Sequence, residues 1–153
     1  MVLDDIYSRD RFLSQLEWIL ALELRYQHIL QSGLVHITYN TRDVQNLTFD
    51  AGDAANRLGE VLACLKNAFR STDLVTREGM SFWILTPFTQ LDPVADKVRH
   101  ILKYAPENGL AIASSQIRVH LLRDHAKQDA AHCKTAEDFL NYLRDQPGSA
   151  EFT

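Results

Sequence analysis

Residues 70–85 read RSTDLVTREGMSFWIL, and they are the most informative segment of the chain. Two short runs rich in β-branched and apolar residues, 73–77 and 82–86, lie on either side of Gly79. This pattern predicts a β-hairpin that turns at the glycine. Because alternate side chains of a strand point to opposite faces of a sheet, Phe82 and Ile84 should share one face.

The segments around this hairpin predict further helices and strands. Apolar residues at helical spacing, an Asp-Pro pair and a Thr-x-x-Asp pattern predict helices over 9–31, 54–70, 92–104 and 135–144. Strands are predicted over 34–39, 110–113 and 117–121. Strands joined once by a hairpin and otherwise by helices imply an α+β fold with a mainly antiparallel sheet.

Composition indicates one globular domain. The chain has 153 residues, of which 46% are hydrophobic and 24% are charged, and this is enough to bury a core. We expect the domain to cover residues 1–146, with 147–153 as a flexible C-terminal tail. A net charge of −4 disfavours a broad nucleic-acid surface. No apolar run approaches the roughly 20 residues that cross a bilayer, so no direct membrane contact is expected.

The two cysteines, Cys64 and Cys133, form neither a disulfide framework nor a metal-spaced pair, which favours a reducing cytoplasm. A metal cluster of His120, His125, His132 and Cys133 is disfavoured as well, because the spacing fits no standard zinc pattern. We assign Trp18, Phe82 and Trp83 to packing.

Several landmarks, in order, resemble the GGDEF family of diguanylate cyclases. The chain has an Arg70-x-x-Asp73 motif and a turn that reads EGMSF at 78–82. It also has an opening LDDIYSRDRFL at 3–13, an AGD at 51–53, a TPFT at 86–89 and an ADKVR at 95–99. The resemblance holds from residue 3 to about residue 99. It implies a ferredoxin-like nucleotide-cyclase fold, βααββαβ, with a five-stranded sheet flanked by helices.

The resemblance also implies that the catalytic residues are absent. Joining two GTP molecules requires divalent cations, which are held by carboxylates. The family's two strand aspartates align with His36 and Thr38, and its acidic pair in the turn aligns with Met80 and Ser81. None of these four residues is a carboxylate, and Glu78 would bring a negative charge to the position of a glycine that approaches phosphate. We therefore expect no catalytic residues and no metal.

The family's inhibitory site, in contrast, aligns with residues of suitable chemistry. Arg70 and Asp73 match the motif that holds cyclic di-GMP, and Lys97 falls where a second arginine often lies. A guanidinium donates to phosphate or to the guanine edge, whereas a carboxylate accepts from guanine N1 and N2. A surface ion pair between Arg70 and Asp73, with no ligand, explains the motif equally well.

Asp53 matches the family's contact to the guanine of GTP, but its partner asparagine is replaced by Val44. A cap or turn role is favoured for Asp53, because aspartate prefers such positions intrinsically.

The leading hypothesis is a catalytically inactive GGDEF-like regulatory domain that binds cyclic di-GMP. A nucleotide-independent domain that forms a homodimer or docks a signalling protein is the alternative. An active diguanylate cyclase with relocated metal ligands is the third hypothesis.

Overall fold

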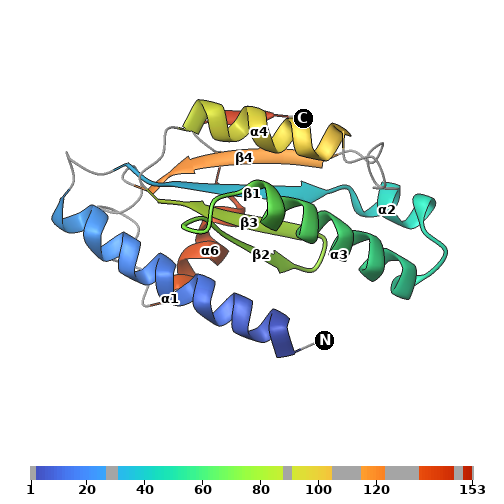
Figure 1. The fold of residues 1–153 in the computed structure, drawn as a ribbon, viewed down its shortest axis with the longest axis horizontal. Coiled ribbons are helices and arrows are strands. Elements are labelled where there is room, and N and C mark those ends of the chain that lie inside the picture. The colour runs from blue at the N-terminus through green and yellow to red at the C-terminus, as the bar shows by residue number, and fades with distance from the viewer. Residues whose placement is uncertain are drawn as a thin grey trace.

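The computed structural model describes residues 3–26, 31–87, 91–104, 115–122, 135–146 and 150–152. Along the chain, the elements are α1 (Leu3–Arg25), β1 (Gly33–Tyr39), α2 (Thr41–Leu47), α3 (Ala51–Ala68), β2 (Leu74–Glu78) and β3 (Ser81–Thr86). They continue with α4 (Leu91–Tyr104), β4 (Ser115–Leu121), α6 (Ala136–Arg144) and β5 (Ala150–Phe152). Figure 1 shows these elements around one sheet.

The strands form a five-stranded sheet in the order β2-β3-β1-β4-β5, and every neighbouring pair is antiparallel. The run from β1 to β4 is βααββαβ, so the predicted fold class is confirmed. The predicted hairpin is β2 and β3, and Gly79 at its turn has a φ of 61°, a left-handed conformation that glycine adopts without a side-chain clash.

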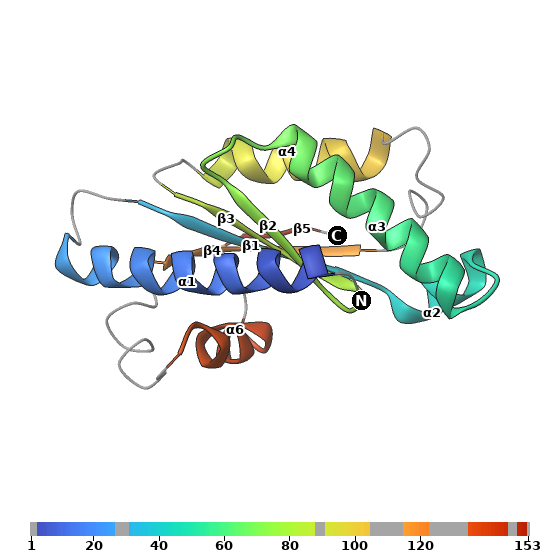
Figure 2. The same ribbon diagram turned by 60° about the horizontal axis from the view of Figure 1, so that its bottom comes forward.

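Helices cover both faces of the sheet, α1 and α6 on one side and α3 and α4 on the other (Figure 2). Successive strand residues therefore enter different cores, and both cores are apolar. Phe82 and Ile84 pack on the α3 side, whereas Trp83 and Leu85 pack on the α1 side, which confirms the predicted alternation.

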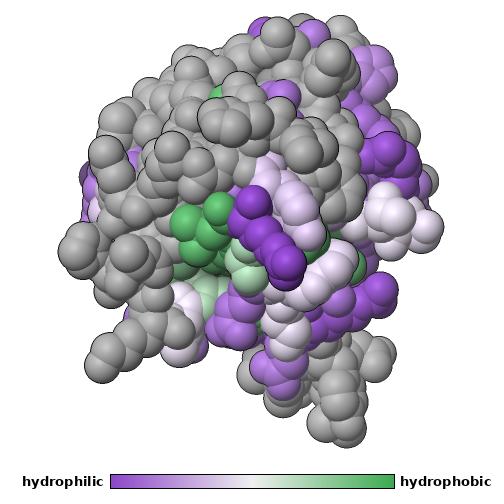
Figure 3. Space-filling view, turned by 90° about the vertical axis from the view of Figure 1, so that its left-hand side faces the viewer, coloured by the Kyte–Doolittle hydropathy of each residue, from purple (hydrophilic) through white to green (hydrophobic). Residues whose placement is uncertain are grey.

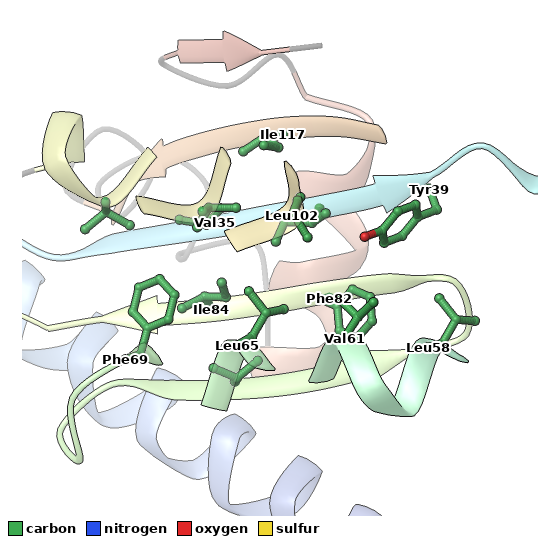
Figure 4. Packing of buried hydrophobic residues seen from close by; sticks show 14 of the residues in the cluster. Val35, Tyr39, Leu58, Val61, Leu65, Phe69, Phe82, Ile84, Leu102 and Ile117 are labelled. Atoms are coloured by element: carbon green, nitrogen blue, oxygen red, sulfur yellow. The ribbon is translucent and has the colours of Figure 1, made fainter. Parts of the chain in front are cut away.

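Figure 4 shows the core on the α3 side, where helix residues Leu58, Val61 and Leu65 lie over the strands. Phe69, at the end of α3, closes the same cluster. Burying a large apolar side chain of this kind stabilises the folded state by roughly 1.5–3 kcal/mol. These contacts fix the end of α3, and with it the loop that carries Arg70.

Several predicted boundaries differ from those of the structure. The first helix begins at Leu3 and ends at Arg25, earlier than predicted at both ends, and α2 was missed. The predicted strand at 110–113 lies outside the described residues. The N-cap at Thr135 is confirmed, since its hydroxyl accepts the backbone N–H of Asp138 at 3.1 Å.

Residues 150–152 belong to the segment predicted to be a flexible tail, and they form β5, which pairs with β4. These three residues therefore extend the sheet by one short edge strand. Among the described helices, none has the combination of length and apolar character that a membrane crossing needs.

Candidate functional site

The loop between α3 and β2 carries the Arg-x-x-Asp motif in a closed turn. The backbone N–H of Asp73 donates to the carbonyl of Arg70 at 3.0 Å. In return, Asp73 Oδ2 accepts the backbone N–H of Arg70 at 3.1 Å and lies 3.4 Å from Arg70 Nε. The ion pair considered in the sequence analysis is therefore present.

The two side chains of this pair differ in exposure. The Arg70 side chain is 59% exposed, whereas that of Asp73 is 3% exposed. Among the described residues, nothing donates a hydrogen bond to Asp73 Oδ1. In this conformation Asp73 supports the loop and orients Arg70, and Arg70 is the member of the pair that solvent reaches.

Lys97 reaches the same end of α3 from α4. Its Nζ lies 4.7 Å from the centroid of the Phe69 ring, a cation–π geometry. Phe69 directly precedes Arg70 in the chain, so Lys97 contacts the residue next to the Arg70–Asp73 turn. Arg70 and Lys97 both present positive charge to solvent, since Lys97 is also exposed.

A pocket of about 510 Å³ lies on the other side of Arg70, towards α1. Its lining residues come from α1, the α3–β2 loop, β2 and the end of β3: Arg11, Gln15, Trp18, Ile19, Arg70, Ser71, Thr72, Leu74, Leu85 and Pro87. Figure 3 views the end of the molecule where β3 ends, and hydrophobic surface is visible there in a hollow bordered by hydrophilic side chains.

Trp18 was predicted to pack in the core, and this prediction was wrong. Its side chain is 56% exposed, because it lies on the flank of α1 beside the pocket, next to the buried Ile19. Leu24, which also lies on α1, is 44% exposed. Phe82 and Trp83 are fully buried, as predicted.

The positions that align with the metal-binding aspartates hold different chemistry. The ring of His36 stacks on Trp83, with a centroid distance of 3.8 Å and an interplanar angle of 7°. Burial, together with the nearby charges of His120, Arg144 and Arg118, lowers the pKa of His36 to about 3. The imidazole is therefore neutral at neutral pH. Thr38 Oγ1 lies 3.5 Å from His36 Nε2.

The turn of the hairpin is likewise held by structural contacts. Ser81 Oγ donates to the carbonyl of Glu78 at 2.8 Å, and the Met80 carbonyl accepts the backbone N–H of Tyr39 at 3.2 Å. The Met80 side chain packs against the core on the α3 side.

Glu78 forms ion pairs with arginines of two helices. Arg9 Nη1 donates to Glu78 Oε2 at 3.3 Å, and Arg144 pairs with Oε1. Arg9 also donates to Glu137 at 2.8 Å, so α1, β2 and α6 are linked through charged groups. This network was not predicted, because its members are far apart in sequence.

The predicted cap role of Asp53 is confirmed. Its backbone N–H donates to Oδ1 of the N-cap residue Asp50 at 2.8 Å, and its own Oδ2 accepts the N–H of Phe49 at 3.0 Å. Arg57 Nε lies 3.5 Å from Asp53 Oδ1. Val44, at the aligned asparagine position, is a buried core residue of α2.

Within the described ranges, no three His, Cys, Asp or Glu side chains are grouped as metal ligands would be. Cys64 is a free thiol on α3. His120 is fully buried in β4, whereas His125, His132 and Cys133 lie outside the described residues.

Comparison with protein-family models and with curated proteins gives no match. Solved structures do match. The GGDEF domain of YfiN (TpbB) from Pseudomonas aeruginosa superimposes with a TM-score of 0.62 at 20% identity, over 92% of each chain. The GGDEF domain of DgcB from Caulobacter crescentus, in complex with cyclic di-GMP, has a TM-score of 0.57 at 12% identity, over 88% of this chain and 84% of that one.

A third structure, the diguanylate cyclase SiaD in complex with its activator SiaC from Pseudomonas aeruginosa, has a TM-score of 0.60 at 19% identity. The match covers 84% of this chain but only 56% of the SiaD chain. At these levels of sequence identity, the similarity shows a shared backbone fold only. The chain therefore has the fold of the GGDEF domains of diguanylate cyclases.

Proposed function

We propose that this chain is a catalytically inactive, cytoplasmic GGDEF-like regulatory domain, and that it binds cyclic di-GMP through Arg70, Asp73 and Lys97. The observation that supports this proposal most is that an exposed arginine follows the end of α3, while an exposed lysine contacts the ring of the preceding residue, Phe69. Arg70 comes from the α3–β2 loop, and Lys97 comes from α4 across the Phe69 ring. Cyclic di-GMP carries two phosphates and two guanines, which are partners for such groups.

Asp73 has an indirect part in this proposal. Its carboxylate is buried against the turn and already accepts from Arg70. It holds the guanidinium in place, and a direct contact to a guanine edge requires the turn to open. Loss of Asp73 therefore weakens binding mainly through Arg70.

The proposal of inactivity is supported by the contacts at the aligned catalytic positions. His36 is stacked and neutral, Ser81 is bonded to the turn, and Glu78 is paired with two arginines. Magnesium prefers carboxylate and other hard oxygen ligands, so neither an imidazole nor a thioether at these positions replaces the missing aspartates.

The test is isothermal titration of cyclic di-GMP into the purified domain and three variants. A charge-assisted contact contributes roughly 1.5–3 kcal/mol, so Arg70→Ala should weaken binding about tenfold or more. Asp73→Ala should also weaken it. Lys97→Arg should leave the affinity unchanged or raise it, because a forked donor replaces a point charge.

Arg42→Ala is the matched control. Arg42 is an exposed arginine on α2, outside the motif, and its loss should leave the affinity unchanged. Absence of binding at high micromolar ligand, in a sample whose circular dichroism shows the folded domain, would refute the receptor proposal.

A separate observation supports the alternative function, which is partner docking or homodimer formation. Three large apolar or aromatic side chains are exposed along α1 and directly after it: Trp18, Leu24 and Tyr26, by 56%, 44% and 40%. Exposed apolar groups on one helix are typical of interaction surfaces. Light scattering distinguishes this function: a dimer of the unmodified domain that dissociates in Leu24→Arg supports it, and a monomer at all concentrations excludes the homodimer.

A further inference from the structure

The pocket between α1 and the α3–β2 loop combines a cationic part with an aromatic wall. Arg11 and Arg70 lie on different elements and both line it, as does the half-exposed indole of Trp18. Ile19, Leu74 and Leu85 supply apolar surface. Its volume of about 510 Å³ lies within the range of pockets that bind small molecules, roughly 300–1,000 Å³.

These groups select a particular ligand chemistry. Two guanidinium groups suit a phosphate monoester, which carries a charge of about −1.5 to −2 near neutral pH, better than a monocarboxylate. The exposed face of an indole stacks on a planar base, and such stacking tolerates every base.

We propose that this pocket is a second ligand site, which binds a nucleoside monophosphate. The phosphate lies between Arg11 and Arg70, and the base lies against Trp18. Gln15, Ser71 and Thr72 offer hydrogen bonds to the sugar or to the base edge. The site shares Arg70 with the proposed cyclic di-GMP site, but its other groups come from α1, the α3–β2 loop, β2 and the end of β3, and none comes from α4.

The chain offers a direct optical test, because it has two tryptophans, Trp18 at the pocket and Trp83 in the core. GMP should quench the tryptophan fluorescence of the unmodified domain in a saturable way. Trp18→Phe, which leaves only the buried Trp83, should abolish the quenching. Saturable quenching that persists in Trp18→Phe, or none at millimolar GMP in the folded unmodified domain, would contradict the proposal.

Calorimetry with the same probe tests the individual groups. Arg11→Ala and Trp18→Ala should each weaken GMP binding about tenfold, whereas Arg42→Ala should leave it unchanged. Guanosine and indole-3-acetate should each bind at least tenfold more weakly than GMP, because neither carries a phosphate. Equal affinity for indole-3-acetate and GMP would overturn the phosphate assignment.

The two proposed sites can be tested independently of each other. Lys97→Ala removes a group of the cyclic di-GMP site that does not line the pocket, and it should leave GMP binding unchanged. Loss of GMP binding in Lys97→Ala, with Arg11→Ala unaffected, would place the nucleotide at the other site and refute the second one.

Discussion

His36 occupies the aligned position of a metal-binding aspartate, yet its surroundings are those of a core residue. Its ring is 7% exposed and stacked on Trp83, and two arginines and His120 add positive potential. Burial and these charges disfavour the protonated form, which explains the pKa of about 3. These surroundings keep the His36 imidazole neutral, although the sequence resemblance aligns this position with a residue that binds a metal ion.

This environment makes stability depend on pH in a defined window. The folded-state pKa of His36, about 3, is below its ordinary value of 6.5, so from pH 6.5 downwards the unfolded chain takes up a proton that the folded chain does not. Acidification therefore destabilises the fold, and the contribution of His36 is nearly constant above about pH 7.5. At pH 5 the loss from His36 is about 2 kcal/mol.

Urea unfolding at pH 7 and pH 5 checks this prediction. His36→Leu should lose less stability between the two pH values than the unmodified chain, by about 2 kcal/mol. His100→Leu, at an exposed position on α4, should behave like the unmodified chain. If His36→Leu and the unmodified chain lose the same unfolding free energy between pH 7 and pH 5, the pKa of His36 is not lowered in the folded state.

Two glycines provide a matched pair. Gly79 has a φ of 61°, so Gly79→Ala forces a β-carbon into the left-handed region and should lower the unfolding free energy by about 1–2 kcal/mol. Gly59 is inside α3 with no atom within 4 Å of an added Cβ, so Gly59→Ala should raise it by about 0.5–1 kcal/mol. Chemical denaturation measures both changes. An unfolding free energy that changes in the same direction in both variants would contradict the turn geometry.

Besides its packing in the two cores, the hairpin is linked to two helices by the ion pairs of Glu78. Arg9 on α1 and Arg144 on α6 both pair with its carboxylate, although all three side chains are partly exposed. A single exposed ion pair contributes roughly 0–1 kcal/mol, but a network contributes more, and here both Arg9 and Glu78 are held by two partners.

Glu78→Gln should therefore lower the unfolding free energy by about 1 kcal/mol, and raised salt should reduce the difference. Glu60→Gln, an exposed glutamate on α3, is the matched control and should have little effect. Thermal or urea unfolding at low and high salt measures the difference in unfolding free energy between Glu78→Gln and the unmodified chain. A difference that does not respond to salt would point to packing rather than charge.

At the level of elements, local signals were sufficient wherever one residue type determines the geometry. Gly79 marked the turn, Thr135 marked a helix start, and Asp53 was assigned to a cap. α2 was missed because its seven residues bury little besides Val44. Its signal was Asn40, whose side chain accepts the N–H of Asp43 at 3.0 Å.

Features that depend on distant contacts were not predicted. The exposure of Trp18 depends on where α1 lies over the sheet, and helical spacing alone does not determine this position. The pocket beside it needs α1, the α3–β2 loop and β3 together. β5 is three residues long, too short for a sequence pattern, and is defined by its pairing with β4.

The described part of the molecule has the layers and strand order of the GGDEF-domain fold. In this structure His36 stacks on Trp83, Asp53 caps a helix and Glu78 forms ion pairs. A fold can be retained while its sites change, because the fold depends on the cores and the chemistry depends on a few side chains.

Incubation of the purified domain with GTP and Mg²⁺ or Mn²⁺, followed by chromatography of the nucleotides, tests the central claim most directly. The claim is that the catalytic positions are now structural, because His36, Thr38, Met80 and Ser81 supply no carboxylate for a metal. The predicted result is no cyclic di-GMP above a protein-free blank with either metal. Metal-dependent formation of cyclic di-GMP would contradict the claim.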